Sequence, residues 1–269
     1  MTICVTGDVH HMSMATRDQA SLERTEVDAA IEYAEIAAAS DVPVTLFCTG
    51  KCIETEPYRM ARLAAMDNVE LGGHNYWAFT TPVHSAWRAV EKATGGRIGS
   101  WNGPRPFQAL EIRKTIAAFA GLEAEITAWR DHAYRHDGNT APLLADHGFS
   151  HISDAVGPDE PLREEAGLTV VPVNTPPDHE HIYHAFRTPE FVAESDFEGP
   201  FGTESVDVEA WGGWVWESIE ARADEGQPAT VLAHPACMAL ADDLATFSNL
   251  CNRIAETSME LETLSNVRV

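Results

Sequence analysis

The stretch Ile3-Cys4-Val5-Thr6-Gly7-Asp8-Val9-His10-His11 joins a short apolar run to a polar cluster, and this pattern indicates the fold. The run Ile3–Thr6 is typical of a buried strand, and similar runs recur between helical patterns. Strands are predicted at Ile3–Thr6, Val42–Cys48, Val69–Gly72, Ile98–Trp101, Glu125–Trp129, Ser150–Ser153, Leu168–Val173 and Thr230–Ala233. Helices are predicted at Glu23–Ala39, Pro57–Met66, Val83–Ala93, Pro106–Ala120, Thr140–His147 and Leu240–Glu256. This alternation predicts an α/β fold, an irregular (β/α) barrel of seven or eight strands.

The length of 269 residues fits a single domain spanning residues 1–269, and no linker or internal repeat interrupts it. The segment from about 174 to 208 breaks the alternation, because it is rich in proline, histidine and acidic residues and shows little periodicity. We expect it to be a long functional excursion from the barrel.

The charge balance is strongly acidic, with 42 acidic and 18 basic residues and a formal net charge of −24. Such a surface repels phosphate backbones and anionic lipid head groups, so nucleic acid and membrane insertion are not expected. A small molecule or a glycan is the expected substrate. Lysine is scarce and the acids are spread along the chain, a composition that resembles halophilic proteins of salt-accumulating cells.

No apolar stretch is long enough to span a membrane, and the N-terminus enters a strand without a basic region or a cleavage site. The five cysteines are an odd number for a disulfide framework, and free buried thiols are expected. These features favour a cytoplasmic location.

Polar side chains follow several predicted strands. Asp8 and His10 follow the first, His74 the third, Arg130 and His132 the fifth, Asp154 the sixth and His234 the last. In a parallel barrel the carboxyl ends of the strands form the catalytic face, so we expect these side chains to converge.

The chemistry of these side chains suits hydrolysis assisted by a metal. Asp8 and His10 stand two residues apart on an extended chain, so both point to one side. Imidazole and carboxylate ligands suit a divalent metal, zinc above all but also cobalt, nickel or manganese, which activates water and polarises carbonyls. Asp8 is the candidate base, Arg130 the group that keeps it ionised, and His234 the candidate acid.

This set resembles the polysaccharide deacetylase (NodB-homology) family. Asp8-Val9-His10 is similar to its first motif, Gly72-Gly73-His74 to the first half of its second, and Leu232-Ala233-His234-Pro235 to its fifth. Trp129-Arg130 is similar to the third motif, although Asn102 lies in a second possible position, and Ser153-Asp154 is similar to the fourth. The resemblance implies a deacetylase-type barrel, a metal held by His10 and His74, and removal of an acetyl group from an N-acetylated sugar or glycan.

The chain departs from the family at the second histidine of the second motif, where Ala78 stands. His132 is the preferred replacement ligand, and His11, His84 and His136 are alternatives. Asp8 could instead bind the metal itself, or the metal could have been lost.

Aromatic and acidic side chains near the same rim are candidate substrate contacts. The predicted substrate-binding residues are Trp77, Trp101, Tyr134 and Asp154. The segment from Asp178 to His184 could cap the site or bind a second metal, but an exposed acidic loop is favoured.

Two other functions stay open. An allantoinase-like hydrolase of amides or imides would use the same fold, and a catalytically silent glycan-binding barrel would explain the missing histidine. An amidohydrolase-type barrel is disfavoured because its first strand ends in His-x-His, whereas His10 and His11 are adjacent.

Overall fold

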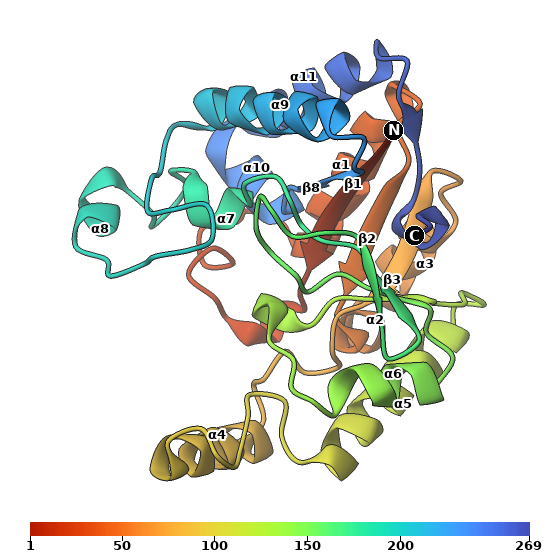
Figure 1. Cartoon of the computed structure of the whole chain (residues 1–269), viewed down its shortest axis with the longest axis vertical. Helices are drawn as coiled ribbons and strands as arrows, with labels where there is room; N and C mark the ends of the chain where they lie inside the picture. Colours follow the sequence, from red (N-terminus) through yellow and green to blue (C-terminus); the bar gives the residue numbers. More distant parts are fainter.

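A curled sheet of nine strands organises the chain, and the computed structural model describes all of residues 1–269 (Figure 1). The strand order is β6-β7-β5-β4-β3-β2-β1-β8, and β9 pairs with the start of β1. Every pairing is parallel except that of β6 with β7. The strands are β1 (Thr2–Val9), β2 (Val44–Cys48), β3 (Val69–Gly73), β4 (Ala128–Trp129), β5 (His151–Ile152), β6 (Arg163–Glu165), β7 (Leu168–Val170), β8 (Ala229–Leu232) and β9 (Glu260–Leu261).

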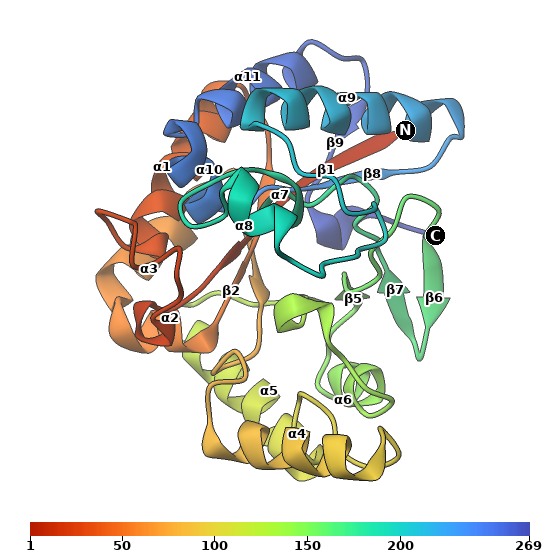
Figure 2. The same cartoon turned by 90° about the vertical axis from the view of Figure 1, so that its left-hand side faces the viewer.

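Eleven α-helices and three 3₁₀ turns surround the sheet. The α-helices are α1 (Glu26–Ala39), α2 (Gly50–Thr55), α3 (Pro57–Ala64), α4 (Pro82–Thr94), α5 (Arg105–Ala120), α6 (Thr140–Asp146), α7 (Asp178–His181), α8 (Pro189–Ala193), α9 (Val208–Asp224), α10 (Pro235–Asp242) and α11 (Ala245–Ala255). The 3₁₀ turns are η1 (Met12–Met14), η2 (His132–Tyr134) and η3 (Leu264–Asn266). Figure 2 shows α9 and α11 at one end of the molecule and α4 and α5 at the other. None of the helices is both long and apolar enough to cross a membrane.

The prediction of an irregular α/β barrel is confirmed. The barrel stays open because β7 and β8 do not pair, and side chains bridge the gap instead. Thr230 donates its backbone N–H to Asn174 Oδ1 (2.9 Å), and Thr175 donates its hydroxyl to the Thr230 carbonyl (3.0 Å). These bonds fix the start of the excursion against β8.

Two sequence-based element predictions are wrong. The stretch Ile98–Trp101 is irregular chain rather than a strand, and Ile98 is exposed. The helix predicted over Leu240–Glu256 is two helices, because Asp243 and Leu244 adopt the left-handed conformation between α10 and α11. In that conformation the backbone cannot continue a right-handed helix.

Hydrophobic burial holds the sheet and its helices together. A core of 44 buried residues draws on β1, β2 and β8 and on the inner faces of α1, α9 and α11. The Tyr33 ring of α1 stacks on the Phe247 ring of α11, with centroids 3.6 Å apart. This packing holds the central strands in place, and it therefore also fixes the positions of the residues at their carboxyl ends.

Candidate active site

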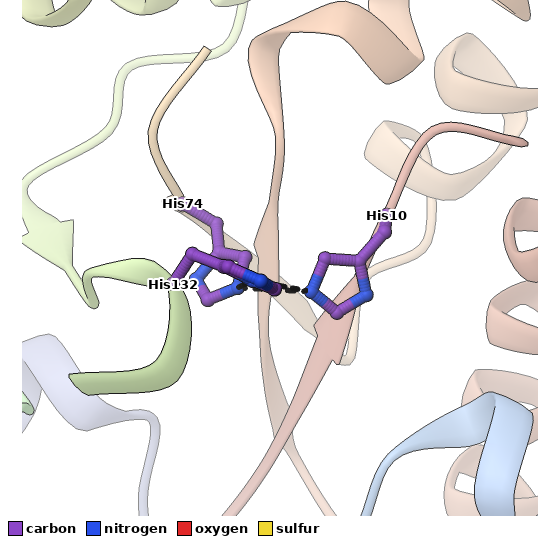
Figure 3. A group of neighbouring side chains, drawn as sticks. All are labelled: His10, His74 and His132. Carbon is purple, nitrogen blue, oxygen red and sulfur yellow. Dashed lines mark hydrogen bonds between the residues drawn. The ribbon is translucent and has the colours of Figure 1, made fainter. Parts of the chain in front are cut away.

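Three histidines from the ends of β1, β3 and β4 converge on one point (Figure 3). His10 Nε2 lies 3.2 Å from His74 Nε2 and 3.1 Å from His132 Nδ1, and the last two atoms are 3.4 Å apart. A tetrahedral zinc ion with Zn–N bonds of about 2.0–2.1 Å separates its nitrogens by about 3.3–3.4 Å. The spacing of the three nitrogens therefore matches the edges of a tetrahedral metal site.

In His10 and His74, the contacts of the Nδ1 atom show that the converging Nε2 atom presents a lone pair. His10 Nδ1 faces the Glu26 carboxylate at 3.0 Å, and His74 Nδ1 faces the Arg130 carbonyl at 2.8 Å. Both partners are acceptors, so each Nδ1 carries the ring proton. Burial lowers the pKa of His74 to about 3 and that of His132 well below its usual value, so these two rings are neutral. Converging lone pairs need a cation, and carboxylate or carbonyl partners of this kind orient metal-bound histidines.

Local structure explains how His74 and His132 reach this point. A Cβ on Gly73 would come within 2.3 Å of the Trp129 ring, so only glycine lets β3 lie this close to β4. His132 begins η2, in which Ala133 and Tyr134 are left-handed. The His132 backbone N–H donates to Asn75 Oδ1 (2.8 Å) and so ties the turn to the end of β3.

Asp8 lies beside the three histidines as an ionised carboxylate. Arg130 Nη1 donates to Asp8 Oδ1 (2.9 Å), and both side chains are buried. Burial opposes ionisation of Asp8, but the Arg130 guanidinium, together with His74 and His234, outweighs burial and holds the pKa of that carboxyl well below its usual range. Arg130 itself is fixed by the Ser153 carbonyl (3.0 Å) and the Ser153 hydroxyl (2.8 Å).

His234, directly after β8, completes the group. Its Nε2 lies 3.6 Å from Asp8 Oδ2, and its Nδ1 lies 2.6 Å from Asp178 Oδ1. Burial opposes charging of this ring, but the Asp178 and Asp8 carboxylates outweigh burial and raise the pKa of His234 to about 10. His234 therefore carries a proton at neutral pH, next to an ionised Asp8.

A cavity of about 260 Å³ is lined by Asp8, His10, His132 and His234 among others, while His74 and Arg130 are not among its lining residues. Its wall includes side chains from the η1 region, α1, η2, α7 and α10, and none of them is lysine or arginine. The lining residues are Asp8, His10, Met14, Thr16, Asp18, Glu26, His132, Ala133, Tyr134, His179, His234, Ala236 and Cys237. An acidic, metal-competent and partly apolar cavity suits a small neutral or cationic ligand.

The structure brings together six of the predicted site residues, namely Asp8, His10, His74, Arg130, His132 and His234. Arg130 rather than Asn102 contacts Asp8, while Asn102 donates to Asp131 Oδ1 (3.0 Å). The alternative ligands are held elsewhere: His11 by Thr49, His84 by Glu111 and His136 by Asp154.

The predicted substrate contacts divide differently. Tyr134 lines the cavity, and its buried hydroxyl has no hydrogen-bond partner. Trp77, Trp101 and Asp154 lie outside the lining. Trp77 stacks on Phe107, Trp101 lies beneath the Arg88 and Arg135 guanidinium groups, and Asp154 accepts the Asp131 backbone N–H at 2.7 Å.

Sequence reasoning missed two partners of the central histidines. Asp178 belongs to the segment that the sequence predicts to be an exposed acidic loop, yet it is fully buried against His234. Its position among histidines was a usable signal. Glu26 begins α1 and looks like an ordinary N-terminal acid, so nothing in the sequence marked it as the partner of His10.

Comparison with known proteins identifies the fold of this chain. No family model matches the sequence, and no curated protein matches it significantly. A putative polysaccharide deacetylase from Mycobacterium smegmatis superimposes with a TM-score of 0.71 at 16% identity, covering 98% of this chain and 87% of that one. A probable polysaccharide deacetylase from Pseudomonas aeruginosa gives a TM-score of 0.65 at 12% identity, covering 98% and 88%.

Other structures of this class differ in function. Puue allantoinase gives a TM-score of 0.62 at 11% identity, covering 98% of this chain and 88% of that one. A CE4 family pseudoenzyme from Bacillus anthracis gives 0.55 at 12% identity, covering 98% and 64%. Similarity at these identities establishes the fold and leaves the chemistry to the site itself. The chain has the fold of the polysaccharide deacetylases.

Proposed function

We propose that this chain is a divergent member of the polysaccharide deacetylase family, a metal-dependent hydrolase that removes the acetyl group from a small N-acetylated sugar. The proposal is carried by one observation, the convergence of the three histidines with the Arg130-bound Asp8 and the Asp178-bound His234, at a cavity that His10, His132, Asp8 and His234 line. Amide hydrolysis needs an activated carbonyl, a base for water and an acid for the leaving nitrogen, and the cavity offers a group for each.

His10, His74 and His132 would hold the metal, and zinc fits the three nitrogens. A divalent ion bound there would polarise the amide carbonyl and lower the pKa of the attacking water.

The chain's own groups supply the proton transfers. Asp8, kept ionised by Arg130, accepts a proton from water as the oxygen attacks the carbonyl carbon. His234, kept protonated by Asp178, donates a proton to the nitrogen as the carbon–nitrogen bond breaks. The products are acetate and an amine, and the proton on Asp8 can return to His234, whose Nε2 lies 3.6 Å away.

The cavity dimensions support a substrate of monosaccharide size. Its volume of about 260 Å³ lies just below the roughly 300–1,000 Å³ of typical ligand pockets. The Tyr134 hydroxyl is available to hydrogen-bond a substrate oxygen. Burial raises the pKa of Tyr134 well above its usual value, so this hydroxyl remains a donor.

The test measures zinc content and acetate release together. Wild-type protein, supplied with zinc and held in high salt, is assayed on a panel of N-acetylated sugars. We expect near-stoichiometric zinc and acetate release, both lost in His74→Ala and both kept in His147→Ala, a matched change at a histidine outside the ligand groups. Zinc binding without acetate release on any sugar, but with hydrolysis of allantoin, would favour the allantoinase-like alternative. Metal binding with no hydrolysis at all would favour a silent glycan-binding barrel and overturn the proposal.

A further inference from the structure

A second group of ligating side chains lies on another wall of the same cavity. Asp18 comes from the loop between η1 and α1, His184 from the excursion after α7, and Cys237 from the first turn of α10. One carboxylate oxygen, one imidazole nitrogen and the thiol sulfur all lie within 4.8 Å of one another. Asp18 and Cys237 both line the cavity, so an ion could reach them from it.

The contact between Asp18 and His184 needs a positive charge between its atoms. His184 Nδ1 lies 3.1 Å from the Ile182 carbonyl, which places the ring proton on Nδ1. The Nε2 lone pair of a neutral ring then faces Asp18 Oδ1 at 3.4 Å, and this buried oxygen makes no hydrogen bond. Two acceptors held this close need a proton or a metal cation to stabilise them.

Cys237, the third side chain of the group, favours a metal over a proton between Asp18 and His184. A proton on His184 would satisfy Asp18 alone, whereas the sulfur of Cys237, the nitrogen of His184 and the carboxylate of Asp18 lie together as a ligand set that suits zinc and its neighbours. The Asp18–His184 separation of 3.4 Å matches the ligand spacing of about 3.3–3.4 Å for bonds of 2.0–2.1 Å. Burial, followed by the negative charge of Asp178, Asp18 and Glu26, raises the pKa of the Cys237 thiol, and Arg187 opposes this effect. The same negative charge attracts a cation, which would displace the thiol proton.

We propose that Asp18, His184 and Cys237 form a second, thiolate-containing site for a divalent transition metal on the wall of the cavity, separate from the three histidines. Binding breaks the sulfur–hydrogen bond of Cys237, forms a metal–sulfur bond and releases the proton to solvent. The inference rests on these three side chains and not on the proposed hydrolase function.

Cobalt(II) reports on this site directly, because only a sulfur ligand gives sulfur-to-cobalt charge-transfer absorption in the near ultraviolet. The full-length metal-free protein is titrated with Co²⁺ under reducing conditions. We expect this absorption to saturate at one equivalent of thiolate-bound cobalt, to disappear in Cys237→Ser and to weaken strongly in His184→Gln and Asp18→Asn. It should persist in His74→Ala, in which the three-histidine site is broken.

The matched control is Cys251→Ser, since Cys251 is also a buried free thiol but belongs to no ligand group. This variant should keep the absorption. Circular dichroism checks that each variant is folded, and Asp18→Asn is the mildest change because its side chain is 23% exposed. Absence of the band in wild type, or its persistence in Cys237→Ser or in folded Asp18→Asn, would overturn the second site and leave the hydrolase proposal unaffected.

Discussion

His74, at the end of β3, and His234, directly after β8, both face Asp8 Oδ2, at 3.8 and 3.6 Å, yet they hold protons differently. Both rings are buried. The second nitrogen of His74 meets a neutral carbonyl, whereas that of His234 meets the Asp178 carboxylate. Burial therefore lowers the pKa of His74 to about 3, while the carboxylates raise that of His234 to about 10.

The contrast shows that the partner of the far ring nitrogen decides the role of each histidine. A neutral imidazole offers a lone pair to a metal, and a protonated imidazole offers a proton to a leaving group. One site can hold both because the first ring is positioned by the early strands and the second by its contact with the excursion that carries Asp178.

The largest expected effect comes from Asp8→Asn, which removes the carboxylate that both histidines face. We expect kcat to fall about 10²–10⁴-fold, the usual contribution of a general base, while zinc stays bound because three nitrogens remain. Acetate release and zinc content are measured on the same sample. Loss of zinc together with activity would show that Asp8 is itself a metal ligand and that the base lies elsewhere.

The second test removes the negative charge beside His234, so that its ring, like that of His74, has a neutral partner at Nδ1. Asp178→Asn keeps the hydrogen-bonding shape but removes the negative charge that raises the pKa of His234. The acid must be protonated, so activity falls as pH rises through that pKa. We expect the alkaline limb of kcat/KM, near pH 10 in wild type, to move down by about 1–3 pH units.

The measurement is a pH–rate profile of both proteins at constant ionic strength. Asp207→Asn, a change at the exposed N-cap of α9, should leave the limb in place. An unmoved limb in Asp178→Asn would show that another group is the acid.

A smaller effect is expected from Glu26→Gln, which weakens the partner of His10 without touching the cluster. Loss of a carboxylate that orients a metal-bound histidine reduces metal affinity about 10–100-fold. Competition with a chelator measures the zinc Kd, and Glu32→Gln on the same helix is the control because Glu32 pairs with Arg24 instead. Equal affinities in the two variants would contradict a supporting role for Glu26.

The site residues that directly follow regular strands can be predicted from the sequence, whereas Asp178, which lies in the excursion, cannot. Asp8, His10 and His74 follow regular strands, so their convergence follows from parallel order alone. His132 could be preferred only among several histidines, because its position depends on two left-handed residues in η2 that no periodicity encodes. Asp178 and Glu26 depend on contacts across 56 and 16 residues of chain, and helix or strand periodicity carries no information on such pairs.

Salt is expected to screen the acids of the surface much more than the buried charges of the cavity. The net charge of −24 predicts mutual repulsion that salt screens, so the free energy of unfolding should rise with KCl. The Tm should increase by about 2–4 °C for each kcal/mol gained, and the triple variant Glu125→Lys, Glu220→Lys, Glu256→Lys, which replaces exposed acids, should gain less. The buried His234–Asp178 pair is screened much less, so the alkaline limb of kcat/KM should stay within a few tenths of a pH unit between low and high salt. A limb that moves with salt as far as it moves in Asp178→Asn would show that the charge on His234 depends on the acidic surface rather than on its buried partner.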